Sequence, residues 1–221
     1  MSHLDTELKY LKDELSVMFR LVQLQVSKCK IALLNFDTDL AKEILSTEKR
    51  VNAMELKIDR DCENILALFN PVAVDLRFVL AALKINSTLE RIGDNAEGIA
   101  RYVLDVHEPF PNEFTQAFSI SEMADTALSM MDDALLALEN EDTAAARKIF
   151  LKDDALDTIN RKATRTTIEL MLQKNAMPLH FLNLLSIVRK MERIGDQTKN
   201  ISEEIIFFIE AKVLRHGQNI D

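Results

Sequence analysis

The sequence predicts an all-helical protein, built as a tandem pair of similar three-helix bundles. Residues that favour helices, such as Ala, Leu, Glu and Lys, are plentiful, while the 221 residues include only four Gly, four Pro and no Trp. Apolar residues recur at alternating steps of three and four over long segments, which is the period of one buried helix face. The pattern of apolar residues and capping residues repeats after 105 residues, which indicates an internal duplication.

Capping residues divide the chain into six expected helices. An Asp-Thr pair able to cap a helix occurs at Asp37 and Thr38 and again at Asp142 and Thr143, so the same turn is present twice. We expect helices at 3–35, 38–69, 72–106, 115–139, 142–175 and 178–215. The corresponding domains are a first bundle at 1–107, a Pro-containing linker at 108–114 and a second bundle at 115–221.

The third helix of each half carries an apolar seam, and the two seams match at an offset of 102 residues. The first consists of Ile85, Leu89, Ile92, Ala96, Ile99, Val103 and Val106, and the second of Ile187, Met191, Ile194, Thr198, Ile201, Ile205 and Phe208. Such a seam is typical of long helices that pack nearly antiparallel in a bundle.

A five-residue motif lies within both seams. The segment Glu-Arg-Ile-Gly-Asp occurs at 90–94 and again at 192–196. Residues four apart share a helix face, so Glu90 stands beside Asp94 and Glu192 beside Asp196, and these paired carboxylates repel each other unless a cation lies nearby. Glycine inside a helix costs about 1 kcal/mol relative to alanine, so the glycine of each motif indicates a close approach by another group.

The second helix of each half offers further oxygen ligands at spacings of four and seven. They are Glu48, Asn52, Glu55 and Asp59 in the first half and Asp153, Asp157, Asn160 and Thr164 in the second. If the second and third helices pack side by side, each half forms an oxygen-only site suited to divalent ions. The alternative is a solvated helix face whose acids pair locally with Arg91, Arg193 or Lys49.

Composition and missing motifs narrow the function. With 36 acidic and 27 basic residues the net charge is −9, so we expect no direct binding to nucleic acid. The start of the chain does not read as a secretory signal and no apolar run approaches the ~18 residues of a membrane span, so we expect a cytoplasmic protein that meets membranes only through partner proteins. No Glu-x-x-His motif, Ser/His/Asp array or phosphate-binding glycine loop occurs, which disfavours an enzyme.

Cys29 and Cys62 lack metal-type spacing and are expected to be small buried residues.

The duplicated Glu-Arg-Ile-Gly-Asp motif on the last helix of paired three-helix bundles resembles the PhoU family of phosphate-transport regulators. The resemblance covers nearly the whole chain. It includes the segment 70–77, Asn-Pro-Val-Ala-Val-Asp-Leu-Arg, which is similar to the family's Gln-Pro-x-Ala-x-Asp-Leu-Arg with Asn70 in place of Gln. Within it, Asp75 and Arg77 either cap the helix start and pair locally or contact a partner protein.

This resemblance implies a non-enzymatic negative regulator of phosphate uptake and of the phosphate-starvation response. Its partners would be the ATPase subunit of the phosphate ABC transporter and a sensor histidine kinase, and we expect a homodimer. It also implies Fe, Zn, Mn or Mg ions, in some members as multinuclear clusters, held by acidic motifs. The metal ligands carried over are Glu48, Glu90, Asp94, Asp153, Asp157, Glu192 and Asp196.

The chain departs from the family's metal motifs at three positions. Asn52 replaces an acid in the first half, Gly98 stands where the second half has Asn200, and Lys199 replaces the usual acid in the second copy. Because cation affinity depends on ligand charge, the neutral Asn52 leads us to predict tighter metal binding in the second half.

Two other hypotheses remain open. The same carboxylates could serve a metal-dependent phosphohydrolase, in which clustered ions activate water. In the other, the chain is a metal-free helical scaffold whose motif glycines only let helices pack closely.

Overall fold

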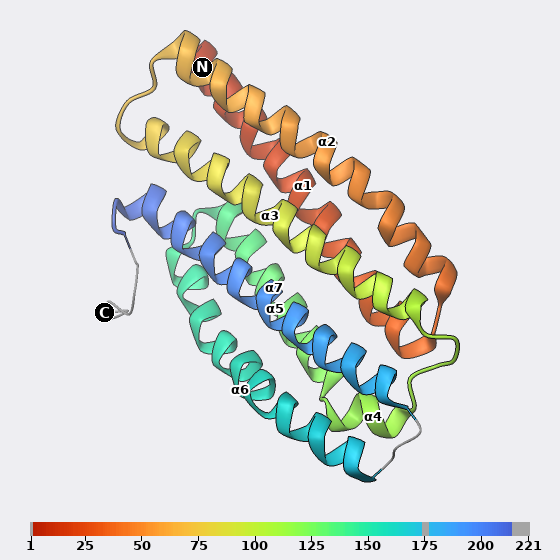
Figure 1. The fold of residues 1–221 in the computed structure, drawn as a ribbon. Helices are drawn as coiled ribbons and strands as arrows, with labels where there is room; N and C mark the ends of the chain where they lie inside the picture. Colours follow the sequence, from red (N-terminus) through yellow and green to blue (C-terminus); the bar gives the residue numbers. More distant parts are fainter. Residues whose placement is uncertain (1, 174–176, 214–221) are drawn as a thin grey trace.

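Two three-helix bundles lie side by side in the computed structural model, which describes residues 2–173 and 177–213 (Figure 1). The first bundle contains α1 (His3–Asn35), α2 (Thr38–Phe69) and α3 (Ala73–Asp105), and the second contains the short α4 (Asn112–Ala117), α5 (Ile120–Asn140), α6 (Thr143–Gln173) and α7 (Pro178–Glu210). No strand occurs in the described ranges, so the all-helical prediction is confirmed. None of the helices there is long and apolar enough to cross a membrane.

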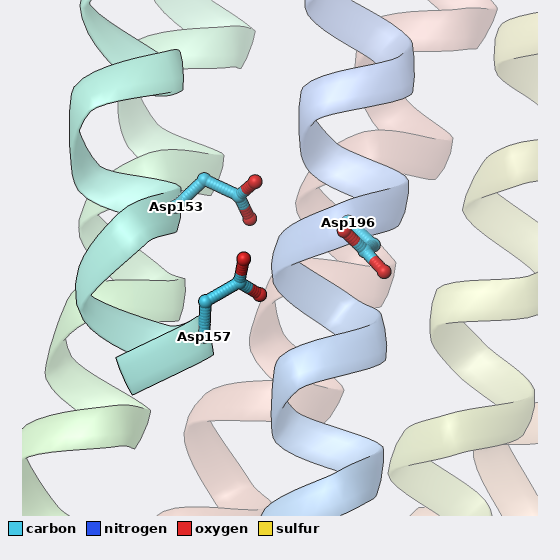
Figure 2. A group of neighbouring side chains, drawn as sticks. All are labelled: Asp153, Asp157 and Asp196. Atoms are coloured by element: carbon cyan, nitrogen blue, oxygen red, sulfur yellow. The ribbon is translucent and has the colours of Figure 1, made fainter. Parts of the chain in front are cut away.

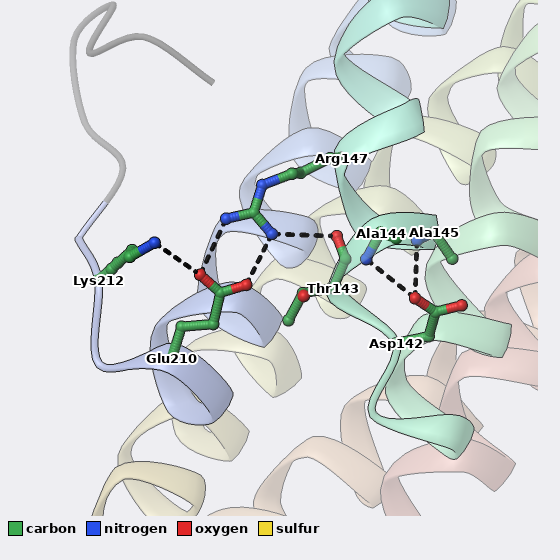
Figure 3. A network of polar contacts seen from close by, with 7 residues as sticks. All are labelled: Asp142, Thr143, Ala144, Ala145, Arg147, Glu210 and Lys212. Atoms are coloured by element: carbon green, nitrogen blue, oxygen red, sulfur yellow. Dashed lines mark hydrogen bonds and ion pairs between the residues drawn. The ribbon is translucent and has the colours of Figure 1, made fainter. Parts of the chain in front are cut away.

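The turn predicted to occur twice does so, with matching geometry. α1 is followed by Phe36 and α5 by Glu141, both in the left-handed region, with φ of 52° and 54°. Asp37 caps α2 by accepting a bond of 2.9 Å from the Leu40 N–H. Asp142 caps α6 by accepting from the backbone N–H groups of Ala144 and Ala145 (Figure 3). Each acid satisfies donors that a helix start leaves unpaired, so each turn begins its helix at a defined residue.

The expected helix at 115–139 is wrong, because the structure divides this region. α4 begins at Asn112, inside the predicted linker, and α5 begins only at Ile120 after Ser119 adopts a φ of 51°. The break lets Phe114 and Phe118 turn inward, and both are buried. The Phe114 ring packs on Phe181 with centroids 4.7 Å apart. Burial of these rings at the end of the second bundle stabilises the bend.

The last helix is shorter than predicted. α7 ends at Glu210 instead of continuing to 215, because Ala211 adopts a φ of 58° and donates its N–H to Phe207 O. The Glu210 side chain then accepts hydrogen bonds of 2.7 and 2.9 Å from the Arg147 guanidinium of α6 (Figure 3). The predicted ends at 175 and 215 lie outside the described residues. Apart from the divided segment at 115–139, the other predicted boundaries agree within about one or two residues.

The two bundles meet along their third helices. α3 and α7 pack side by side in opposite directions, and α1 packs on α5. Lys84 bonds to Glu204 at 3.0 Å near one end of the α3–α7 contact. Arg77 donates to Phe208 O at 3.1 Å beyond it, so Arg77 joins the two halves instead of pairing locally. The duplicated motifs therefore lie near the middle of one antiparallel helix pair.

Both cysteines are buried and free, as expected. Cys29 donates its thiol hydrogen to Ala96 O at 3.2 Å, and burial raises the pKa of both thiols. They behave as small core residues.

Candidate metal centres

Three carboxylates converge between α6 and α7 in the second half. One oxygen each of Asp153, Asp157 and Asp196 lies within 4.8 Å of the others. Figure 2 shows Asp153 and Asp157 projecting from α6 toward α7, which carries Asp196. The spacing of four residues on α6 places both acids on the face that meets α7. No other group of three His, Cys, Asp or Glu residues comes as close within residues 2–173 and 177–213.

Asp153 is the most buried member of this second-half cluster, at 2% exposed. Its Oδ2 accepts a bond of 2.7 Å from the Lys199 ammonium on α7, while its Oδ1 is buried with no hydrogen-bond partner among the described residues. Burying a carboxylate oxygen without a hydrogen-bond partner costs folding free energy, so a hydrogen-bond donor or a cation at this oxygen would stabilise the cluster.

The electrostatics of the second half reflect crowding of like charges. Burial, with added repulsion from Asp153 and Asp157, raises the pKa of Asp196. Burial and repulsion from Asp196 raise the pKa of Glu192, whereas a hydrogen bond from Asn160 opposes that shift. The hydrogen bond to Asp153 is the main reason that the pKa of Lys199 is raised. The ammonium therefore stays charged and stabilises the anionic cluster in place.

The first half carries corresponding acids with a different support, but no three of its described carboxylates come as close to one another as those of the second half. Glu48 of α2 is 5% exposed, and its Oε2 accepts a bond of 3.0 Å from the Gln25 side-chain amide of α1. Its Oε1 has no hydrogen-bond partner among the described residues. Burial is the main reason that the pKa of Glu48 is raised, and repulsion from Asp94, Glu97 and Glu55 adds to it.

Glu90 and Asp94 complete the first-half cluster from α3. Burial, together with repulsion from Asp94, Glu55 and Glu48, raises the pKa of Glu90 to about 7. These mutual effects indicate that the acids of α2 and α3 lie within range of one another's charge. Arg91, Arg193 and Lys49 form no ion pair with a cluster carboxylate in the described ranges. Arg161 lies 3.7 Å from Asp157 and Lys199 lies 2.7 Å from Asp153, so part of the second cluster is paired locally by other residues.

The motif glycines admit close neighbours, as predicted. A Cβ on Gly93 would lie 2.9 Å from Glu48 Oε2, and a Cβ on Gly195 would collide with Leu156 Cδ1 of α6. Gly93 therefore leaves room for a ligand carboxylate, whereas Gly195 leaves room for a core side chain. The same motif serves two different contacts.

The donor sets of both halves fit a hard divalent or ferric ion. All seven sequence-predicted ligands are carboxylates, and Glu48 and Asp153 each present a buried oxygen with no partner in the described residues. Gln25 was missed by sequence reasoning. It occupies a position in the apolar seam of α1 between Val22 and Cys29, and a polar residue on a core seam is the signal that could have revealed it.

Comparison with known proteins identifies the family. A family model described as "PhoU domain" matches the chain at residues 15–103 and again at 120–205, one match in each bundle. The chain belongs to the PhoU family. It is 31% identical to the phosphate-specific transport system accessory protein PhoU of Escherichia coli K12, over 98% of this chain and 90% of that protein. A PhoU of Edwardsiella tarda with the same description is 32% identical over 96% of this chain and 86% of its own length.

Solved PhoU structures have the same architecture. The crystal structure of PhoU from Pseudomonas aeruginosa superposes with a TM-score of 0.89 at 29% identity, covering 95% of this chain and all of that one. PhoU from Streptococcus pneumoniae, described as a phosphate transport system regulatory protein, superposes with a TM-score of 0.87. The fold expected for a PhoU, two duplicated three-helix bundles, is confirmed.

Proposed function

We propose that this PhoU family member is a cytoplasmic, non-enzymatic negative regulator of phosphate uptake and of the phosphate-starvation response. The observation that carries this proposal is the match to the PhoU domain in both bundles, together with relatives described as accessory proteins of the phosphate-specific transport system. The regulator acts by contacting the ATPase subunit of the phosphate ABC transporter and a sensor histidine kinase, and it forms a homodimer.

Divalent or ferric ions, Fe, Zn, Mn or Mg, bind at the two acidic clusters in this proposal. The ligands would be Glu48, Glu90 and Asp94 in the first half and Asp153, Asp157, Glu192 and Asp196 in the second. Bound cations would offset the burial and the mutual repulsion that raise the pKa of Glu90, Glu192 and Asp196. They would stabilise the contact between the second and third helix of each bundle.

An apolar stripe on the outer face of α1 supports action through protein contacts. Tyr10, Val17, Leu24 and Ile31 recur every seven residues and are 45–51% exposed. Residues seven apart lie on one side of a helix, so they form a continuous strip. Exposed apolar strips of this kind typically mark surfaces that another protein covers.

Affinity capture tests this proposal. Tagged full-length protein from phosphate-replete cells should retain the transporter ATPase and the sensor kinase. Val17→Ser combined with Leu24→Ser should reduce that retention several-fold. As a matched control, Leu68→Ser combined with Leu151→Ser removes two exposed leucines away from the stripe, which are 71% and 76% exposed, and should leave it unchanged. Absence of both partners from the wild-type capture would contradict the proposal.

The non-enzymatic part has its own test. Purified protein supplied with Mn or Fe should not hydrolyse a phosphomonoester above background. Turnover that disappears in Asp196→Ala would overturn it, because that carboxylate would then act in metal-assisted hydrolysis.

A further inference from the structure

A cationic groove crosses the boundary between the two halves and borders the first-half acidic cluster, whose Asp94 also lines it. It lies between α3 and α7 and has a volume of about 660 Å³. Its basic lining residues are Arg91 and Arg101 of α3 and Lys190 and Arg193 of α7. Two acids of α3, Asp94 and Glu97, also line it. Four cations therefore face two anions, in a chain whose overall charge is −9.

Three of the four cations are available to a ligand. Arg101 is already paired with Glu97 at 2.7 Å. The side chains of Arg91, Lys190 and Arg193 form no hydrogen bond or ion pair with any residue in the described ranges, although the two arginines act electrostatically on Glu90 and Glu192 of their own motifs. By contrast, basic residues elsewhere on this boundary, such as Lys84 and Lys30, have carboxylate partners in the other half.

Gly98 accounts for the position of Lys190. A Cβ at Gly98 would collide with Cε and Nζ of Lys190, so the lysine of α7 extends over the bare backbone of α3. Lys190 is half-buried there, while Arg91 and Arg193 are exposed at the groove. The second half has Asn200 at the position that corresponds to Gly98. The absence of a side chain at Gly98 thus allows the Lys190 ammonium of the second half to lie against the first half.

We propose that this groove binds a phosphate-type oxyanion. Lys190 and Arg193 would donate to it from α7 and Arg91 from α3. A guanidinium donates two parallel hydrogen bonds to a phosphate oxygen pair, and an ammonium adds a compact charge, so the three groups supply what a tetrahedral oxyanion requires. The volume falls within the range of small-ligand sites, about 300–1,000 Å³.

The inference goes beyond the proposed function, since a regulator that acts by protein contacts alone requires no anion site. The oxyanion could be free inorganic phosphate or the phosphate group of an organic monoester, and both share the chemistry that the groove recognises. The chain's negative charge disfavours a long polyanion such as nucleic acid, whose phosphates beyond the groove would meet an acidic surface.

Phosphate binding to the full-length chain tests the proposal. The protein is first stripped of metal with a chelator, because phosphate could otherwise bind through a cation at the acidic clusters. Inorganic phosphate and glycerol phosphate are then titrated separately by calorimetry at low ionic strength, where exposed charges are least screened. Saturable one-to-one binding of either compound is expected, and the tighter of the two identifies the source.

Variants locate the binding. Lys190→Gln and Arg193→Gln should each weaken it by about tenfold, since a charge-assisted hydrogen bond contributes roughly that much. Arg189→Gln is the matched control: Arg189 is an exposed cation next to Lys190 in sequence but outside the groove, so affinity should be unchanged. Gly98→Ala retains every charge but displaces the Lys190 head group, and it should weaken binding as well.

Two results would overturn the inference. One is a wild-type protein that binds neither compound. The other is equal weakening by Arg189→Gln and Arg193→Gln, which would show a general effect of charge. Circular dichroism melting curves of each variant separate lost binding from lost folding. Neither result bears on capture of the transporter ATPase and kinase, so the failures of the two proposals are distinguishable.

Discussion

The Lys199 ammonium lies 2.7 Å from Asp153 Oδ2 inside the second acidic cluster, and the corresponding position of the first cluster is Glu97. The two clusters have therefore diverged in charge. The second has gained an acid at Asp157, where the first has Asn52, but it also contains a resident cation. An incoming metal ion would compete with that ammonium, so Lys199 opposes the advantage that Asp157 gives.

Replacing Lys199 with methionine should increase cation affinity in the second half. Removing a unit positive charge near the site should raise the affinity for Mn²⁺ by about tenfold. Without metal, the same variant should lose about 1–3 kcal/mol of unfolding free energy, because Asp153 would be left buried without a partner. Calorimetric titration and urea unfolding measure the two effects. Lys199→Arg keeps the charge and serves as the control, and equal Mn²⁺ affinity in all three proteins would refute the competition.

Metal content should depend on the second-half acids. Asp153→Ala combined with Asp196→Ala removes two of the three carboxylates that lie within 4.8 Å of one another, so the bound metal should fall, and elemental analysis of purified protein measures it. Glu48→Ala combined with Asp94→Ala is the matched pair in the first half. If the second half binds metal more tightly, Asp153→Ala combined with Asp196→Ala should remove the tighter of the two sites. Unchanged metal content in both would defeat the proposal of metal binding.

The two motif glycines should respond differently to alanine. In Gly195→Ala the new Cβ collides with the buried Leu156 side chain, and such overpacking costs about 1–3 kcal/mol, more than the gain of about 1 kcal/mol in helix propensity. In Gly93→Ala the Cβ meets the ends of the Glu48 and Gln25 side chains, so stability should hold while metal binding in the first half weakens. Urea unfolding with metal titration checks both. A stability gain of about 1 kcal/mol at both sites would instead support the metal-free scaffold.

Stability of the metal-free protein should fall as the pH rises from about 4.5 to about 7. The pKa of Glu90 is raised from 4.5 to about 7, so in this window the folded protein holds a proton that the unfolded chain has lost. The stability that this proton contributes is fully present at acidic pH and disappears as Glu90 ionises. Glu90→Gln should flatten the dependence, and Mn²⁺ should reverse it, since a cation favours the ionised carboxylate. Thermal unfolding across this pH range measures each case.

Glu210 provides a control of opposite sign. Its bond to Arg147 lowers its pKa from 4.5 to about 2, so the stability it contributes is present above pH 4.5 and is lost as the pH falls toward 2. Glu210→Gln should therefore reduce stability at pH 7 by up to about 1 kcal/mol, without changing the slope between pH 4.5 and 7. If Glu210→Gln changed that slope, Glu90 would not be the main source of the pH dependence between pH 4.5 and 7.

The duplicated fold and the converging acids could be predicted because they follow from short-range rules. Helix period, the Asp37 and Asp142 caps and the four-residue spacing of carboxylates each depend on a few neighbouring residues. The break at Ser119 could not, because it results from Phe114 packing on Phe181, a contact between residues distant in the chain. Local pattern alone favours one continuous helix there.

The same limit applies to the site. Gln25 lies 23 residues from Glu48, and no residue near Gln25 in sequence indicates that its side chain donates a hydrogen bond to a carboxylate. Arg77 was expected to act within its own helix start or toward a partner, yet it bonds to Phe208 O, 131 residues away. Such links depend on how whole helices are placed against each other, which a single sequence specifies only through the summed packing of the core.

The seating of Lys190 on Gly98 makes the groove a property of the intact chain. Each half alone would keep its acidic cluster, because those ligands come from helices of one bundle. A fragment cut between the bundles would lose the groove entirely, since one wall comes from residues before the cut and the other from residues after it. The groove is thus a composite surface that depends on the correct docking of both copies.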